Sequence, residues 1–113
     1  MQKLGLALAA TLALSAPAKA ETLKMATIAP SLGAAISMAT FANIVTKNVD
    51  GIEIEVAAGG AATLHMMEVG RGNLDMSMTS PVVYNLMSGG KAMYAKQADA
   101  PELARNVNLL MWY

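Results

Sequence analysis

The sequence predicts an α/β fold built on a parallel sheet. Three observations support this prediction. Stretches with the period of a strand alternate with stretches with the period of a helix, junctions rich in glycine and proline separate them, and the helical stretches are long enough to connect parallel strands. No internal repeat, charge block or low-complexity linker interrupts residues 21–113, so we expect one domain or a part of one.

The first strand is predicted at residues 22–29, where mostly apolar side chains alternate between two faces. Residues 30–33 break this strand. From Ala34 the period becomes helical, because apolar side chains recur at i, i+3, i+4 and i+7 in Met38, Phe41, Ala42 and Val45. Residues 48–51 end the helix and turn the chain. The pattern predicts a helix with one buried stripe.

The second strand follows directly, since Ile52, Ile54 and Val56 alternate with Glu53 and Glu55. This period of two is typical of a strand that is buried on one face only. After the small residues 57–60, helical spacing resumes over residues 61–69, with Leu64 and Met67 predicted to face inward, and residues 70–72 close the helix.

A short third strand is predicted at residues 75–79. Ser80 and Pro81 then favour a helix start. A Ser side chain at the N-cap accepts a hydrogen bond from a free backbone amide, and Pro at N1 lacks the amide N–H that would otherwise be unpaired. This helix runs to the stop at residues 88–90. Residues 91–100 show no clear period, residues 101–105 fit one short turn, and the apolar residues 106–113 predict a final strand.

Residues 1–20 are predicted to be a secretory signal peptide, with an early cation at Lys3, an apolar run over 4–14 and small residues up to Ala20. The apolar run is shorter than the roughly 20 residues of a transmembrane helix, and no Cys follows for lipid attachment. We therefore expect cleavage after Ala20 and release into the periplasm. Because the last predicted strand stops without a turn or polar tail, we expect residues 21–113 to form an incomplete N-terminal α/β lobe.

Charge and composition exclude several classes of function. The chain has eight Lys and Arg against eight Asp and Glu, and two of the lysines, Lys3 and Lys19, lie in the predicted signal peptide. The mature chain therefore carries about −2, which gives no electrostatic footprint for nucleic acid. With no Cys, the protein has no disulfide framework and depends on its hydrophobic core.

Ligands of open parallel α/β sheets bind at the carboxyl ends of the strands. Here these ends are the junctions at residues 29–33, 57–63 and 79–81, where free amides at helix N-termini favour an anion. A small carboxylate held by these amides and by hydroxyl groups is the predicted ligand; the candidate hydroxyls belong to Ser31, Thr63, Thr79 and Ser80. The alternative is that each hydroxyl simply caps a helix.

Other site chemistries are disfavoured. Gly59-Gly60 lacks the Gly-Lys-Ser/Thr ending of a phosphate loop and the third glycine of a dinucleotide motif, so no nucleotide cofactor is expected. His65 is the only histidine, which leaves no usual metal site, and we expect it on a helix surface. No G-x-S-x-G motif surrounds a serine, so no enzymatic activity is predicted. The many methionines are interpreted as adaptable core filling rather than as a copper site or flexible groove.

The segments LKMATIAP, GIEIEVAAGGA and VGRGNLDMSMTSPVVYNLM resemble the solute receptors of tripartite ATP-independent periplasmic (TRAP) transporters, of the TAXI type. The most specific part is a Gly-Gly at the head of a helix, followed by a Gly-x-x-Asp turn at residues 72–75 and a strand ending in Thr79-Ser80. The resemblance covers essentially all of residues 21–113. The first loop departs from the family pattern, because it lacks a Gly- and aromatic-rich turn.

The resemblance implies a monomeric two-lobed periplasmic-binding-protein fold of type II kind. Such a receptor closes on a small carboxylate, an amino acid such as glutamate or glutamine or a dicarboxylate, and delivers it to the TRAP permease subunits in the membrane. It implies ligand contacts in three loops, formed by Ser31 and Gly33, by Gly60, Ala61 and Thr63, and by Thr79 and Ser80. Asp75 is expected to cap a turn, and Arg71 to lie at the end of its helix away from the ligand.

Two kinds of alternative stay open. A DctP-type receptor or the binding protein of an ABC transporter belongs to the same two-lobed class. An envelope sensor or surface antigen would use the same fold to contact protein without transport.

Overall fold

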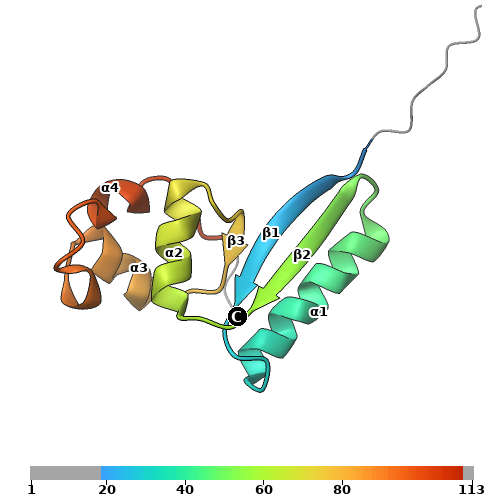
Figure 1. Cartoon of the computed structure of the whole chain (residues 1–113), viewed down its shortest axis with the longest axis horizontal. Helices are drawn as coiled ribbons and strands as arrows, with labels where there is room; N and C mark the ends of the chain where they lie inside the picture. Colours follow the sequence, from blue (N-terminus) through green and yellow to red (C-terminus); the bar gives the residue numbers. More distant parts are fainter. Residues whose placement is uncertain (1–18, 111–113) are drawn as a thin grey trace, which may run out of the picture.

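The computed structural model describes residues 19–110, which form a three-stranded parallel sheet with helices (Figure 1). The prediction of an α/β fold is thus confirmed. The elements in chain order are β1 (Glu21–Thr27), α1 (Gly33–Asn48), β2 (Ile52–Ala58), α2 (Ala62–Arg71), β3 (Met76–Ser77), α3 (Pro81–Ser88), the 3₁₀ helix η1 (Ala92–Tyr94) and α4 (Ala100–Ala104).

The sheet has the order β2-β1-β3, with both pairs parallel. The register between β1 and β2 runs from Glu21 opposite Ile52 to Thr27 opposite Ala58. On the other side of β1, Met25 lies opposite Met76. Because all three strands run in the same direction, their carboxyl ends meet at one edge of the sheet, which we call the carboxyl edge.

Helix α1 covers one face of β1 and β2 and forms the first core (Figure 1). Met25, Ala42 and Ile54 are its buried residues, and Met38, Phe41 and Val45 pack against them as predicted. Burial of a side chain the size of Met25 contributes about 1.5–3 kcal/mol. The hydroxyl of Thr46 in α1 also accepts a hydrogen bond from the Ile54 amide of β2 at 2.9 Å, which fixes the helix on the sheet.

Helices α2, α3 and α4 gather beyond β3 and form a second core (Figure 1). Its buried residues include Met66, Met67, Met87 and Tyr94. The prediction that Leu64 faces inward was wrong, because its side chain is 60% exposed and Met66 is buried instead. Helix α2 turns its buried side toward α4, and a Cβ on Gly70 would lie 2.8 Å from a backbone oxygen of α4.

The third strand is shorter than the predicted residues 75–79, since only Met76–Ser77 pair with β1. Asp75 bonds across the sheet rather than capping its own turn: its carboxylate accepts from the Lys24 amide at 2.7 Å, and its amide donates to the Lys24 carbonyl oxygen at 2.9 Å. Helix α3 begins as predicted, because Ser80 is its N-cap and Pro81 its first residue.

The predicted final strand is not formed over residues 106–110, which have no regular structure. The Asn106 side-chain amide donates to the Gly70 carbonyl oxygen at 3.1 Å, and Val107 packs into the second core. These contacts attach the start of this segment to the helices of the second core. Residues 111–113 of that prediction, and residues 1–18 of the predicted signal peptide, lie outside the described residues.

Candidate functional site

The first two strand-to-helix junctions lie side by side at the carboxyl edge. The Gly59 amide donates to the Thr27 carbonyl oxygen at 2.9 Å, which joins the end of β2 to the end of β1. Gly59 and Gly60 then take φ values of +108° and +84°, a region that side chains rarely tolerate. The two glycines therefore let the chain turn sharply from β2 into α2.

Ser31 and Gly33, the candidates of the first junction, are exposed at the N-terminus of α1. The N-cap residue is Leu32, which offers no side-chain acceptor to the helix. Among the described residues, no hydrogen bond is formed by the amides of Gly33 and Ala34 or by the Ser31 hydroxyl. These donors are free to meet an anion at the positive end of the helix.

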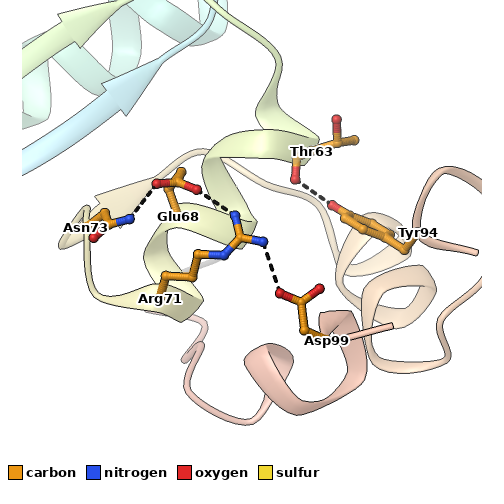
Figure 2. Close-up of polar contacts among 6 residues, drawn as sticks. All are labelled: Thr63, Glu68, Arg71, Asn73, Tyr94 and Asp99. Carbon is orange, nitrogen blue, oxygen red and sulfur yellow. Dashed lines mark hydrogen bonds and ion pairs between the residues drawn. The ribbon is translucent and has the colours of Figure 1, made fainter. Parts of the chain in front are cut away.

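The second junction brings Gly60, Ala61 and Thr63 to the N-terminus of α2. Its N-cap, Ala61, also lacks a side-chain acceptor, and the amides of Ala62 and Thr63 have no partner within residues 19–110. The Thr63 carbonyl oxygen accepts from the Tyr94 hydroxyl at 2.9 Å (Figure 2). This bond holds the first turn of α2 in place while leaving its amides available.

The third junction differs, because its hydroxyls already have structural partners. The Ser80 hydroxyl accepts from the Val83 amide at 3.3 Å and caps α3. The Thr79 hydroxyl donates to the Met66 sulfur at 3.7 Å. For Ser80 the structure therefore bears out the capping role, and Pro81 removes another amide from this helix N-terminus.

His65 lies close to the second junction. The sequence predicted it on a helix surface, and in the structure it is half-buried. Its imidazole packs against Gly60, where an added Cβ would lie 2.7 Å from Nε2. Nδ1 is buried and has no hydrogen-bond partner among the described residues. In the sequence, the only indication of this contact is that His65 follows Gly60 by five residues, across the start of α2.

The three junction segments themselves contain no Asp, Glu, Lys or Arg. Residues 25–46, 56–67 and 76–90, which contain the three junctions, include none of these four residue types. Large apolar side chains instead stand exposed near the end of β2, at the first junction and in the first turns of the helices, a feature that the sequence patterns did not predict; they are Leu32, Ile36, Val56, Leu64 and Val82. We call these five residues the apolar rim.

The charged residues of α2 lie at its other end (Figure 2). Arg71 donates to Glu68 at 2.7 Å and to Asp99 at 3.0 Å, so it is engaged away from the carboxyl edge, as predicted. The Asn73 side-chain amide donates to Glu68 at 2.7 Å. The hydrogen bonds from Asn73 and then Arg71 lower the pKa of Glu68, and the bonds to Glu68 and Asp99 raise the pKa of Arg71.

Two other features of the described chain bear on function. No three His, Cys, Asp or Glu side chains within residues 19–110 gather closely enough to hold a metal ion. No helix in the same stretch is both long and apolar enough to cross a membrane. The arrangement therefore offers unpaired helix amides, the hydroxyls of Ser31 and Thr63 and the apolar rim. These groups suit a small anion whose remaining part is uncharged.

A scan against protein-family models, a search of curated proteins and a search of solved structures each returned no match.

Proposed function

We propose that this protein is a periplasmic solute-binding receptor of the TAXI type. In this proposal it captures a small carboxylate at the carboxyl edge and delivers it to a TRAP-type permease in the membrane. Residues 21–113 form the first part of a two-lobed fold, and a second lobe closes over the bound solute. Residues 1–20 direct the chain to the periplasm.

The observation that carries the proposal is the pair of uncapped helix N-termini. The amides of Gly33 and Ala34 and those of Ala62 and Thr63 come from two neighbouring junctions, and no protein group among the described residues satisfies them. Most polar backbone groups that a fold leaves unpaired are met by water or by a ligand. A carboxylate placed here accepts several amide hydrogen bonds at the positive ends of two helices.

The absence of charged residues from the three junction segments narrows the range of ligands that they can bind. A second carboxylate would find no Lys or Arg in residues 25–46, 56–67 or 76–90, and an ion that loses water without a partner is strongly disfavoured. The apolar rim instead favours an uncharged ligand body. Among the candidate solutes, a compound with a single carboxylate therefore fits this half of the site better than a dicarboxylate, and the ammonium group of an amino acid would have to find its partner outside these residues.

A thermal-shift titration tests the proposal. A ligand that binds only the folded state stabilises it by RT ln(1 + [L]/Kd), about 2.7 kcal/mol at a hundredfold excess over Kd. We expect the unfolding temperature to rise with the concentration of a carboxylate and to stay constant with the matching amide. No shift with any small carboxylate contradicts the receptor.

Two proline substitutions remove single amide donors without breaking the helices. Gly33 and Ala62 are the first residues of α1 and α2, where Pro is tolerated. Leu32 and Ala61 before them are extended, at φ −89°, ψ 137° and φ −102°, ψ 130°, the conformation that a following Pro requires. We expect Gly33→Pro and Ala62→Pro to fold normally and to lose the carboxylate-induced shift.

A second candidate function is an envelope sensor or surface antigen that contacts protein through the carboxyl edge. The apolar rim favours it, because Leu64 and Val82 are 60% and 67% exposed and large exposed apolar side chains are typical of surfaces that contact another protein. A titration without any carboxylate shift, together with binding of an envelope protein that Leu64→Glu abolishes, supports this candidate over the receptor.

A further inference from the structure

A cavity of about 110 Å³ lies between the two cores. Its volume is several times the roughly 10–15 Å³ that one water molecule needs. Phe41, which packs against the first core, and Val69, which packs against the second, both line it. None of the four residues whose amides form the proposed carboxylate site is part of its walls. The cavity is therefore a separate space from that site.

Four methionines from three segments of the chain line this cavity, which we call the methionine cavity. They are Met25 of β1, Met38 of α1, Met76 of β3 and Met78 just after β3. Met25 and Met76 are direct partners in the parallel pair of β1 and β3, so their side chains leave neighbouring strands on the same face. Met38 packs from α1 onto this cluster. The fold thus gathers thioether sulfurs for which the sequence pattern predicted only core filling.

The side chains of the methionine cavity suit a soft metal ion. Thioether sulfur is a soft ligand that selects Cu(I), whereas Zn²⁺ prefers Cys and His and Ca²⁺ takes six to eight oxygen ligands. Among the described residues that line the cavity, none is Cys or His, and Asp75 is the only charged one. Methionine has three rotatable bonds, which allow the side chains to turn their sulfurs toward a shared ion. We propose that the methionine cavity binds one Cu(I) ion through its four methionine sulfurs.

The charge of the cavity walls also favours a monovalent ion. An ion that leaves water without a partner is strongly disfavoured, and this desolvation cost rises with the square of the charge. Asp75 supplies one carboxylate, which is exposed and is held in place because its Oδ2 accepts a hydrogen bond from the Lys24 amide at 2.7 Å. This single negative charge balances Cu(I) but leaves a divalent ion half uncompensated.

Titration of the full chain with Ag(I), a soft monovalent ion that needs no reductant, tests the proposal. The protein carries ¹³C-labelled methionine methyl groups and is kept in a chloride-free buffer. We expect Ag(I) to shift the methyl resonances of the four cavity methionines to saturation at one equivalent. The resonances of Met66 and Met87 in the second core and of the exposed Met93 should stay in place. Zn²⁺ should leave all of these resonances unchanged.

Met38→Leu removes one sulfur and keeps an apolar side chain of similar volume. Groups that merely support a metal ligand are worth about 10–100-fold in affinity, so the loss of a sulfur ligand should weaken Ag(I) binding by about tenfold or more. Met93→Leu is the matched control, because Met93 is 52% exposed and does not line the cavity. Circular dichroism measures folding, and Met78→Leu replaces Met38→Leu if the latter does not fold.

A competition experiment then tests Cu(I) itself, under reducing conditions and without oxygen. The wild type should withdraw one equivalent of Cu(I) from a colorimetric Cu(I) chelator, and Met38→Leu should withdraw less. The proposal is overturned if the four methyl resonances do not saturate, if Met93 shifts as much as they do, if folded Met38→Leu binds Ag(I) as tightly as the wild type, or if the chelator keeps its Cu(I). Because no cavity residue supplies an amide of the carboxylate site, the two proposals fail independently.

Discussion

The hydroxyl of Tyr94 donates to the carbonyl oxygen of Thr63 at 2.9 Å (Figure 2). Tyr94 lies in η1, and its side chain is buried in the second core. Burial raises the pKa of the Tyr94 hydroxyl, which keeps the proton that the bond requires. A residue 31 positions away in sequence thus holds the first turn of α2, whose amides belong to the candidate site.

Tyr94→Phe is expected to lower the free energy of unfolding by about 1 kcal/mol, because the hydrogen bond from the buried hydroxyl to the Thr63 carbonyl oxygen is lost. Urea denaturation measures this change. Tyr84→Phe is the control, since the Tyr84 hydroxyl donates to the Ala104 carbonyl oxygen at the longer distance of 3.3 Å and should matter less. An equal decrease in the free energy of unfolding in the two variants would show that the hydrogen bond to Thr63 stabilises the fold no more than the longer bond to Ala104.

Gly60→Ala is expected to destabilise the protein more than Gly51→Ala. Both glycines have φ near +80°, at +84° and +80°, which costs a residue with a Cβ about 1–2 kcal/mol. Only at Gly60 does the new Cβ also collide with a side chain, 2.7 Å from Nε2 of His65, whereas nothing lies within 4 Å at Gly51.

The difference between the two unfolding free energies isolates the His65 contact. Adding His65→Ala to Gly60→Ala should remove most of that difference, because the smaller side chain vacates the space. A double variant no more stable than Gly60→Ala alone would argue against the packing of His65 on the loop.

Ser80→Ala and Ser31→Ala are expected to separate a capping role from a ligand role. Ser80→Ala removes the N-cap of α3 and should cost about 1 kcal/mol of stability. Ser31→Ala should leave stability nearly unchanged, because its hydroxyl makes no hydrogen bond within the described chain, but it should weaken carboxylate binding. Thermal unfolding with and without ligand measures both effects; a large stability loss in Ser31→Ala would speak against its role in the site.

Acid is expected to weaken the network around Glu68. Because hydrogen bonds from Asn73 and Arg71 lower the pKa of Glu68 in the folded chain, ionised Glu68 stabilises the fold above the ordinary carboxyl pKa. This stabilisation is lost as the pH falls through the lowered value. The wild type should therefore exceed Glu68→Gln in unfolding temperature at about pH 7 and approach it at about pH 3. A difference between the two chains that does not change with pH contradicts this assignment.

Local patterns were enough to predict the sheet, α1 and the start of α3. The alternation of isoleucines and glutamates in β2 and the stripe from Met38 to Val45 depend only on neighbouring residues. Ser80-Pro81 marks a helix start by its own chemistry. For the same reason the positions of the three junctions, and hence the candidate residues at the carboxyl edge, follow from the sequence.

Contacts between distant residues account for what the sequence patterns missed. The buried side of α2 is set by α4, where Gly70 meets Leu103, and nothing near Leu64 in sequence reveals this partner. Residues 106–110 have the composition of a strand, yet Asn106 and Val107 bind the helices instead. The apolar rim and the place of His65 also depend on which surfaces the fold leaves uncovered.

The central claim is that the uncapped amides of α1 and α2 bind a carboxylate. Titration of the ¹⁵N-labelled protein with a small monocarboxylate, followed through its backbone amide resonances, tests it most directly. The account predicts saturating shifts at Gly33, Ala34, Ala62 and Thr63, with much smaller changes at Arg71 and Asn73 at the far end of α2. Absence of saturable shifts at those four amides, or equal shifts at both ends of α2, would contradict it.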